Sequence, residues 1–96
     1  PMSKYIAAML ALVAASALGA DLPPAEGEVR RVNAAGQEIT LRHGDIKNLD
    51  MPPMTMVFKV KDAALLEKVK TGDKVRFTAD KINGAYTVLT IEPAAP

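Results

Sequence analysis

The only histidine of the chain lies near three of its five methionines, in the segment "HGDIKNLDMPPMTM" (residues 43 to 56). Thioether sulfur is a soft, neutral donor that favours Cu(I) and, by the same softness, Ag(I). Zinc would require thiolates, carboxylates or further imidazoles, and the chain has no cysteine and a single histidine. The segment therefore indicates a soft-metal site, unless these side chains belong to an ordinary hydrophobic core.

The alternative, a structural role, is the commoner one for each residue taken singly. Methionine often fills gaps in a core, and Met54 and Met56 share a predicted strand face with Phe58. His43 shares a predicted face with Leu41, where a buried histidine can serve packing alone. The residue types by themselves leave both interpretations open.

The predicted strand pairing brings the same residues together. His43 ends one predicted strand and Met54 begins the next. If the two strands pair as a hairpin, the end of the first lies beside the start of the second. Met54 and Met56 are two residues apart and so project on one side of their strand. We expect His43, Met54 and Met56 to converge at the mouth of a barrel, with Met51 in the loop that closes over it.

The intervening loop carries two further features. Asp45 and Asp50 would suit a hard cation, but two loop carboxylates fall short of a calcium site. Pro52 and Pro53 stiffen the backbone just before the next predicted strand, so we expect them to restrict the position of Met51. Neutral thioethers leave the charge of a bound cation uncompensated, which suits a carrier that must release its metal. Cysteine would bind Cu(I) more strongly and could oxidise in an exported compartment.

Short alternating runs separated by turn signals predict an all-β domain. One short helical turn is expected over residues 62 to 70, with Asp62 as its N-cap. Asn83 and Gly84 form a strong hairpin signal. Five strands of this size can close into a small OB-type barrel, with the helical turn between strands 3 and 4, and a small open sandwich is the alternative. The predicted strands cover residues 28–33, 38–43, 54–60, 74–80 and 85–92.

The beginning of the chain is typical of a secretory signal peptide. Lys4 precedes an apolar run over residues 5 to 14, and Ala15, Ser16 and Ala17 then fit the small-residue cleavage pattern. The run is shorter than the roughly 20 residues of a membrane span. A buried N-terminal helix or a retained anchor is the alternative. We expect a signal peptide over 1–20, a linker over 21–27, a metal-binding domain over 28–92 and a tail over 93–96, with no membrane insertion after cleavage.

Charge and cysteine content exclude several classes of protein. Lys4 is the only charged residue before Asp21, so 11 basic and 11 acidic side chains remain and the formal balance is zero. A neutral domain lacks the electrostatic footprint of a nucleic-acid-binding protein and the polybasic face that anionic membranes attract. Without cysteine no disulfide can form, so a domain of about 75 residues must rely on packing or on a metal.

The segments "ITLRHGDIKNLDMPPMTMVF" and "KTGDKVRF" resemble the CusF family of periplasmic copper and silver chaperones, which accompany heavy-metal efflux pumps. The resemblance extends by strand spacing over residues 27 to 92. It implies a five-stranded OB-type barrel that binds one Cu(I) or Ag(I) ion, with His43, Met54 and Met56 as ligands by position. The family often has a tryptophan, which covers the metal through a cation–π contact, where this chain has Met51. Met51 is therefore expected as a fourth ligand or as an apolar cover.

The resemblance implies a monomeric periplasmic metallochaperone that passes its ion by ligand exchange to a periplasmic adaptor or pump subunit of an efflux system. The alternative is an OB-fold binding module for oligonucleotide or saccharide, which would need exposed aromatic side chains. An enzyme is not expected, because there is no cysteine nucleophile and His43 has no evident serine partner. A set of lysines could form a docking face or a plain solvated surface: Lys59, Lys61, Lys68, Lys70 and Lys74.

Overall fold

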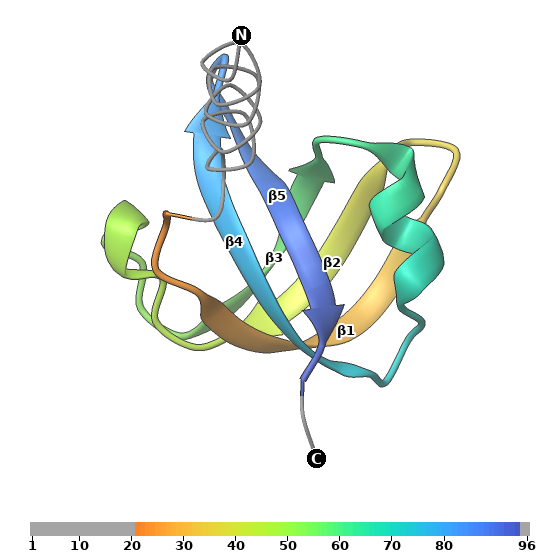
Figure 1. Ribbon diagram of the computed structural model, residues 1–96, viewed down its shortest axis with the longest axis horizontal. Helices are drawn as coiled ribbons and strands as arrows, with labels where there is room; N and C mark the ends of the chain where they lie inside the picture. Colours follow the sequence, from red (N-terminus) through yellow and green to blue (C-terminus); the bar gives the residue numbers. More distant parts are fainter. Residues whose placement is uncertain (1–20, 95–96) are drawn as a thin grey trace, which may run out of the picture.

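Five strands close into a barrel in the computed structural model, which describes residues 21 to 94 (Figure 1). The strand order is β1-β2-β3-β5-β4, and β4 pairs back with β1. The predicted five-stranded OB-type barrel is thereby confirmed, and the open sandwich is excluded. The strands are β1 (Ala25–Asn33), β2 (Glu38–His43), β3 (Met54–Val60), β4 (Lys74–Ile82) and β5 (Ala85–Pro93).

The barrel is closed unevenly. Four of its strand pairs are antiparallel, and the β3–β5 pair is parallel. β3 meets β5 at two residue pairs, Lys59 with Thr87 and Val60 with Val88. The first part of β3 therefore has β2 on one side and no strand among residues 21 to 94 on the other.

Strand alternation places one continuous core inside the barrel. Phe58 lies at its centre, with its ring edge-on to Phe77 at a centroid distance of 5.9 Å. Burying one large apolar side chain of this kind contributes roughly 2–3 kcal/mol. The predicted inward face of β4 is confirmed, because Val75, Phe77 and Ala79 are all buried. The largest fully buried side chains are Phe58, Phe77, Ile39, Leu41, Ile46, Val29, Val75 and Val88.

The first strand begins earlier than the sequence pattern indicated. β1 starts at Ala25 rather than Glu28, so the end of the segment expected as a linker pairs with β4. The reason is packing: Ala25 is 4% exposed and lies opposite Phe77. At the other end, β5 runs to Pro93, and the Ala94 N–H donates to the Lys74 carbonyl at 2.8 Å. The expected signal peptide and the last two residues lie outside the described residues.

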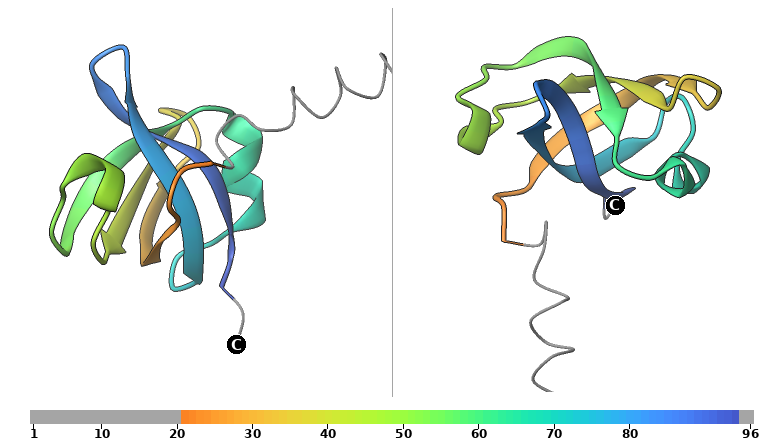
Figure 2. Two further views of the ribbon diagram at one scale, coloured as in Figure 1. Left: turned by 60° about the vertical axis from the view of Figure 1, so that its left-hand side comes forward. Right: turned by 90° about the horizontal axis from the view of Figure 1, so that it is seen from above.

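Two short 3-10 helices complete the fold, η1 (Lys47–Leu49) and η2 (Ala63–Lys68). The predicted helical turn is η2, and its expected cap is present: Asp62 Oδ1 accepts a hydrogen bond from the Ala64 N–H at 2.9 Å. Figure 2 shows η1 and η2 on opposite sides of the barrel. Between residues 21 and 94 no helix is both long and apolar enough to cross a membrane.

The β4–β5 turn has the geometry that its residues predicted. Asn83 has φ 50° and Gly84 has φ 82°, so both central residues take the left-handed conformation of a tight two-residue hairpin. The two strands then pair from Ile82 with Ala85 down to Val75 with Pro93. Figure 2 shows the tip of this hairpin projecting beyond the rest of the barrel.

Candidate metal centre

The ends of β2 and β3 meet as the sequence predicted. His43 pairs with Met54, and Met56 pairs with Leu41 two residues further along β3. Side chains two residues apart share a face, so His43, Met54 and Met56 project on the barrel side of this strand pair. The register therefore brings three of the four candidate donors to one end of the barrel.

These three donors differ in their exposure to solvent. The His43 side chain lies inside the barrel and is 3% exposed, whereas Met54 is 45% exposed. Met56 is half-buried and packs against the core. Along this face of β3, exposure falls from Met54 through Met56 to the fully buried Phe58. The imidazole thus lies at the inner end of the candidate site and one thioether at its outer end.

The two ring nitrogens of His43 have different environments. Nδ1 lies 2.7 Å from the Gly44 carbonyl oxygen. A carbonyl only accepts, so Nδ1 carries the proton and Nε2 carries the lone pair. Nε2 is buried and has no hydrogen-bond partner, and it is the only buried side-chain nitrogen or oxygen in residues 21–94 in that state. Burying a polar atom without a partner is unfavourable, and a backbone carbonyl on one nitrogen is the usual arrangement of a histidine whose other nitrogen binds a metal.

Two neighbours fix the His43 ring and backbone. Phe58 meets the imidazole edge-on, with 5.6 Å between ring centroids and 70° between ring planes. Gly27 pairs with His43 across β1 and β2. A Cβ at Gly27 would lie 2.8 Å from the Arg42 carbonyl oxygen and 3.3 Å from the His43 Cα. Sequence reasoning missed Gly27, although a glycine inside a strand often marks a close backbone approach.

The segment from residue 44 to residue 53, called the lid below, joins the two strand ends. Ile46 and Met51 exchange backbone hydrogen bonds: the Ile46 N–H donates to the Met51 carbonyl at 3.0 Å, and the Met51 N–H donates to the Ile46 carbonyl at 3.1 Å. The Ile46 side chain is 1% exposed and belongs to the core. η1 forms the tip between these residues, and Asp50 then takes a left-handed φ of 53°. Ile46 therefore holds the backbone of Met51 in place.

Met51 itself occupies a different position from the other candidate donors. Its side chain is half-buried and packs against the core. It lines a shallow hollow formed within the lid, whereas His43 lines another hollow between β1, β2 and β4. The register accounts for His43, Met54 and Met56 as neighbours, but Met51 reaches this end of the barrel through the lid.

The described residues contain no cluster of side chains suited to a hard metal ion. No group of three or more His, Cys, Asp or Glu side chains could hold a metal ion there. Asp45 and Asp50 lie in the lid, and both are exposed.

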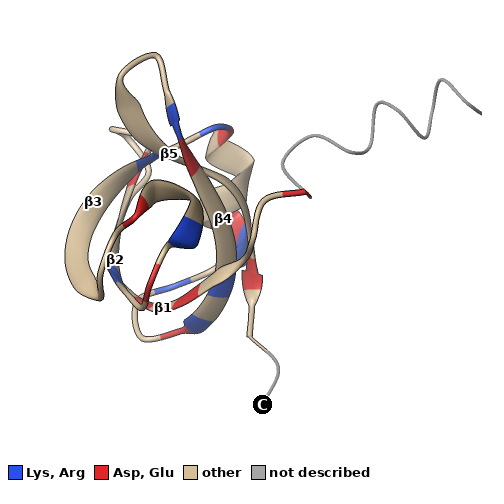
Figure 3. Cartoon of the chain, turned by 90° about the vertical axis from the view of Figure 1, so that its left-hand side faces the viewer, with Lys and Arg blue, Asp and Glu red and all other residues tan. Residues whose placement is uncertain are grey.

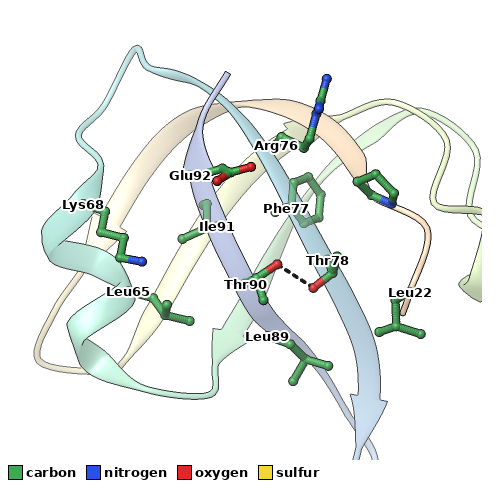
Figure 4. A pocket seen from close by; sticks show the side chains of 11 residues that line it. Leu22, Leu65, Lys68, Arg76, Phe77, Thr78, Leu89, Thr90, Ile91 and Glu92 are labelled. Atoms are coloured by element: carbon green, nitrogen blue, oxygen red, sulfur yellow. Dashed lines mark hydrogen bonds between the residues drawn. The ribbon is translucent and has the colours of Figure 1, made fainter. Parts of the chain in front are cut away.

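A further hollow of about 360 Å³ lies over β4 and β5, next to η2 (Figure 4). Its floor includes the Thr78–Thr90 hydroxyl pair at 2.7 Å, and none of the candidate donors lines it.

The fold defines the class of this protein, a small OB-type barrel, and the comparisons place it within a family. Residues 23–93 match the model of the family described as copper binding periplasmic protein CusF. The match covers most of the chain, which therefore belongs to this family of periplasmic copper-binding proteins.

Two curated relatives are each called cation efflux system protein CusF. The chain is 38% identical over 53 residues to the protein of Escherichia coli O6:H1 and 36% identical over 53 residues to that of strain K12. These matches cover 55% of this chain and 48% of each relative. The chain thus spans about half the length of the curated relatives it matches.

Solved structures share the fold. The metal-free CusF of Escherichia coli superimposes with a TM-score of 0.67 at 28% identity, over 75% of this chain and 86% of that one. CusF with Ag(I) gives a TM-score of 0.63 at 26% identity, over 75% and 90% of the two chains. The C-terminal domain of SilB from Cupriavidus metallidurans gives 0.63 at 26% identity, over 75% and 87%.

Proposed function

We propose that this chain binds one Cu(I) or Ag(I) ion through His43 Nε2 and the sulfur atoms of Met54 and Met56, and carries it to an efflux system. The observation that carries the proposal is the buried Nε2, which has a free lone pair and no partner, on the same strand face as two thioethers. An imidazole with two thioethers is a soft donor set, which favours Cu(I) and Ag(I) over harder cations. A related CusF has been solved with Ag(I), which supports the same choice of ion.

The different exposure of the donors suits release by ligand exchange. Met54 is open to solvent, so a donor from an incoming protein can displace it first. His43 is enclosed by the core and releases the ion last. Because all three donors are neutral, the site does not neutralise the cation, and transfer to a stronger donor set stays favourable.

Met51 supplies either a fourth thioether or an apolar cover for the ion. Its backbone is held by Ile46 and its side chain is half-buried, so it is available at this end of the barrel without a large rearrangement. A fourth sulfur would leave the ion less open to solvent. Replacement of Met51 by leucine separates the two roles, because leucine keeps the apolar volume and removes the donor.

The destination of the ion is a periplasmic adaptor or pump subunit of a heavy-metal efflux system. The carrier is a monomer, which acts after its signal peptide, residues 1–20, has been cleaved. The names of the curated relatives, cation efflux system proteins, support this part of the proposal. A docking face remains a proposal too. The Lys59 ammonium forms an ion pair with the Glu38 carboxylate at 3.1 Å. The five lysines considered for the docking face are all exposed: Lys59, Lys61, Lys68, Lys70 and Lys74.

Titration with Ag(I), followed by NMR of the methionine methyl groups and the histidine ring, tests the proposal. We expect the signals of His43, Met54 and Met56 to shift together and to stop shifting at one equivalent. A shift of the Met51 methyl signal in the same step, together with weaker Ag(I) binding by Met51→Leu, identifies a fourth ligand. Signals of His43 and both strand methionines that stay in place at one equivalent would rule out the site.

The alternative, a binding module for oligonucleotide or saccharide, gains no support from the aromatic residues. Phe58 and Phe77 are buried in the core. Tyr86 is half-buried, and the Lys81 ammonium lies 5.7 Å from its ring centroid. Basic and acidic side chains are interspersed along the strands in Figure 3, which fits the neutral balance of the domain. A stacking platform on a positive surface is the usual requirement for single-stranded nucleic acid.

A further inference from the structure

We propose that Asn48 is a positioning residue for the metal site, which ties the lid to β4 and thereby sets the place of Met51. The inference rests on the proposed function and deepens it. It names a residue outside the donor set that controls how one candidate donor is presented. Nothing in the local sequence pattern around Asn48 assigns it this role.

The tie is a single hydrogen bond between distant parts of the chain. Asn48 Nδ2 donates to the Ala79 carbonyl oxygen at 2.7 Å, across a sequence separation of 31 residues. Among residues 21 to 94, no other lid side chain forms a hydrogen bond with a barrel strand. Ala79 lies just beyond the last residue pair between β1 and β4, Ala25 with Phe77. The amide therefore attaches the lid where β4 has passed the end of its pairing with β1.

The tip of the lid needs such an attachment. η1 has three residues, no side-chain cap at its N-terminus and no buried residue of its own. A single 3-10 turn of this length is not stable without tertiary contacts. Lys47 and Asp50 are exposed, and the half-buried Leu49 supplies the apolar contact of η1 with the core. Asn48 adds the polar contact, which joins the tip to β4.

Hydrogen bonds hold the lid at its base and at its tip, and Leu49 adds an apolar contact with the core at the tip. At its base, Ile46 is buried and bonds to Met51 in both directions. At its tip, Asn48 bonds to Ala79. With the tip released, the lid can pivot about the Ile46–Met51 bridge, and the Met51 side chain then samples a wider range of positions. Preorganisation of a binding group raises affinity because less ordering remains to be done on binding.

The test compares Asn48→Ala with a matched control, Asn33→Ala. Asn33 Oδ1 also makes one hydrogen bond to loop backbone, accepting from the Gly36 N–H at 3.0 Å. It lies at the far end of β1 and β2, since Asn33 pairs with Glu38 whereas Gly27 pairs with His43. Both variants lose an asparagine amide and one loop hydrogen bond, but only one of them is at the lid.

Three quantities are measured: Ag(I) affinity by competition, amide hydrogen exchange of Ile46 and Met51 in the metal-free protein, and thermal unfolding. We expect Asn48→Ala to weaken Ag(I) binding roughly two- to tenfold, the range for loss of one hydrogen bond, and to speed exchange at both amides. Asn33→Ala leaves affinity and lid exchange unchanged. Asn48→Asp, which keeps the size and loses the donor, gives the same result if the alanine variant folds poorly.

The route through Met51 is tested by repeating the measurement in Met51→Ala, which removes both the sulfur and the apolar cover. We expect Asn48→Ala to weaken Ag(I) binding in the presence of Met51 and to have no further effect in its absence. An equal loss in both backgrounds, or unchanged affinity with Met51 present, overturns the positioning role. If the unmodified chain binds no Ag(I), the proposed function fails and the positioning role with it. If binding is normal and Asn48→Ala has no effect, the proposed function stands and only this inference fails.

Discussion

The two strand ends that form the candidate site are held in different ways. The His43 end of β2 has strands on both sides, with Gly27 of β1 and Met54 of β3 as its partners. The Met54 end of β3 has β2 on one side only, because β3 meets β5 no earlier than Lys59. One end of the site is therefore enclosed and the other is open. From this difference we propose that the imidazole retains the ion while an incoming donor displaces the outer thioether.

The largest effect is expected from loss of the enclosed nitrogen. His43→Leu should lower Ag(I) affinity by more than about 100-fold, because loss of a residue that merely supports a ligand typically costs 10- to 100-fold. In the metal-free barrel the loss of the unpartnered Nε2 stabilises the fold and the loss of the Nδ1 hydrogen bond to Gly44 destabilises it, so the free energy of unfolding should change by less than about 1.5 kcal/mol. Competition titration and chemical denaturation measure the two quantities.

His43→Leu also tests the assignment of Nε2. A variant that loses stability well beyond the worth of one hydrogen bond and keeps its affinity would show that His43 serves the core. A variant that keeps affinity would show that the thioethers alone hold the ion.

Lower pH should weaken Ag(I) binding by the enclosed His43 nitrogen and leave binding by the thioethers unaffected. A proton and a metal ion compete for the same Nε2 lone pair, so affinity should fall as pH decreases. Thioethers do not titrate in this range. Ag(I) affinity measured from about pH 7.5 to about pH 5 should fall in the unmodified chain and stay level in His43→Leu, which lacks this nitrogen. A level profile in the unmodified chain would exclude His43 as a ligand.

Substitutions of Met54 and Met56 should differ in their effect on the free energy of unfolding more than in their effect on Ag(I) affinity. Met54→Leu and Met56→Leu should each lower Ag(I) affinity by about tenfold, because leucine keeps the shape and removes the donor. Met54 is exposed, so its replacement should change the free energy of unfolding by less than about 0.5 kcal/mol. Met56 packs against the core, and its replacement should cost up to about 1.5 kcal/mol.

Thr55→Val is the control for both methionine variants. Thr55 lies between them on the opposite strand face and is exposed. Affinity that falls in Thr55→Val as much as in the methionine variants would contradict the assignment by strand face.

The smallest change in affinity is expected from the glycines around His43, where two substitutions can be compared. A Cβ at Gly27 would lie 2.8 Å from the Arg42 carbonyl oxygen, whereas a Cβ at Gly44 would have nothing nearer than the Glu26 carbonyl oxygen at 3.9 Å. Gly27→Ala should cost about 1–3 kcal/mol of unfolding free energy, the usual range for overpacking. It should also weaken Ag(I) binding a few-fold by moving His43.

Gly44→Ala should change neither the free energy of unfolding nor the Ag(I) affinity appreciably. Thermal unfolding and Ag(I) titration of the pair measure the difference. Equal effects of the two substitutions would show that close approach at Gly27 does not matter for His43.

Strand periodicity predicted the part of the site that depends on local pattern. The alternation that put His43 on one face with Leu41, and Met54 on one face with Met56, is the alternation found in β2 and β3. The hairpin pairing of the two strands then followed from their order. The start of β1 at Ala25 could not be read in the same way, because the preceding "DLPP" and the glycine at position 27 interrupt the apolar pattern.

The contacts that hold the donors in place are of another kind. The Asn48–Ala79 hydrogen bond joins residues far apart in the chain, and the Ile46–Met51 bridge depends on burial of Ile46. Sequence reasoning assigned the restraint of Met51 to the two prolines that follow it, whereas the backbone of Met51 is bonded to Ile46. The free Nε2 likewise follows from the Gly44 carbonyl next to Nδ1, which no residue spacing encodes.

The most direct test observes the His43 ring itself, by long-range proton–nitrogen correlation NMR of the metal-free chain and of the chain with one equivalent of Ag(I). We expect a metal-free ring protonated at Nδ1, where the Gly44 carbonyl accepts, and unprotonated at Nε2. On addition of Ag(I), the Nε2 resonance should shift strongly and Nδ1 should stay protonated. A metal-free ring protonated at Nε2, or an Nε2 resonance that does not move with Ag(I), would exclude Nε2 as the metal-binding nitrogen.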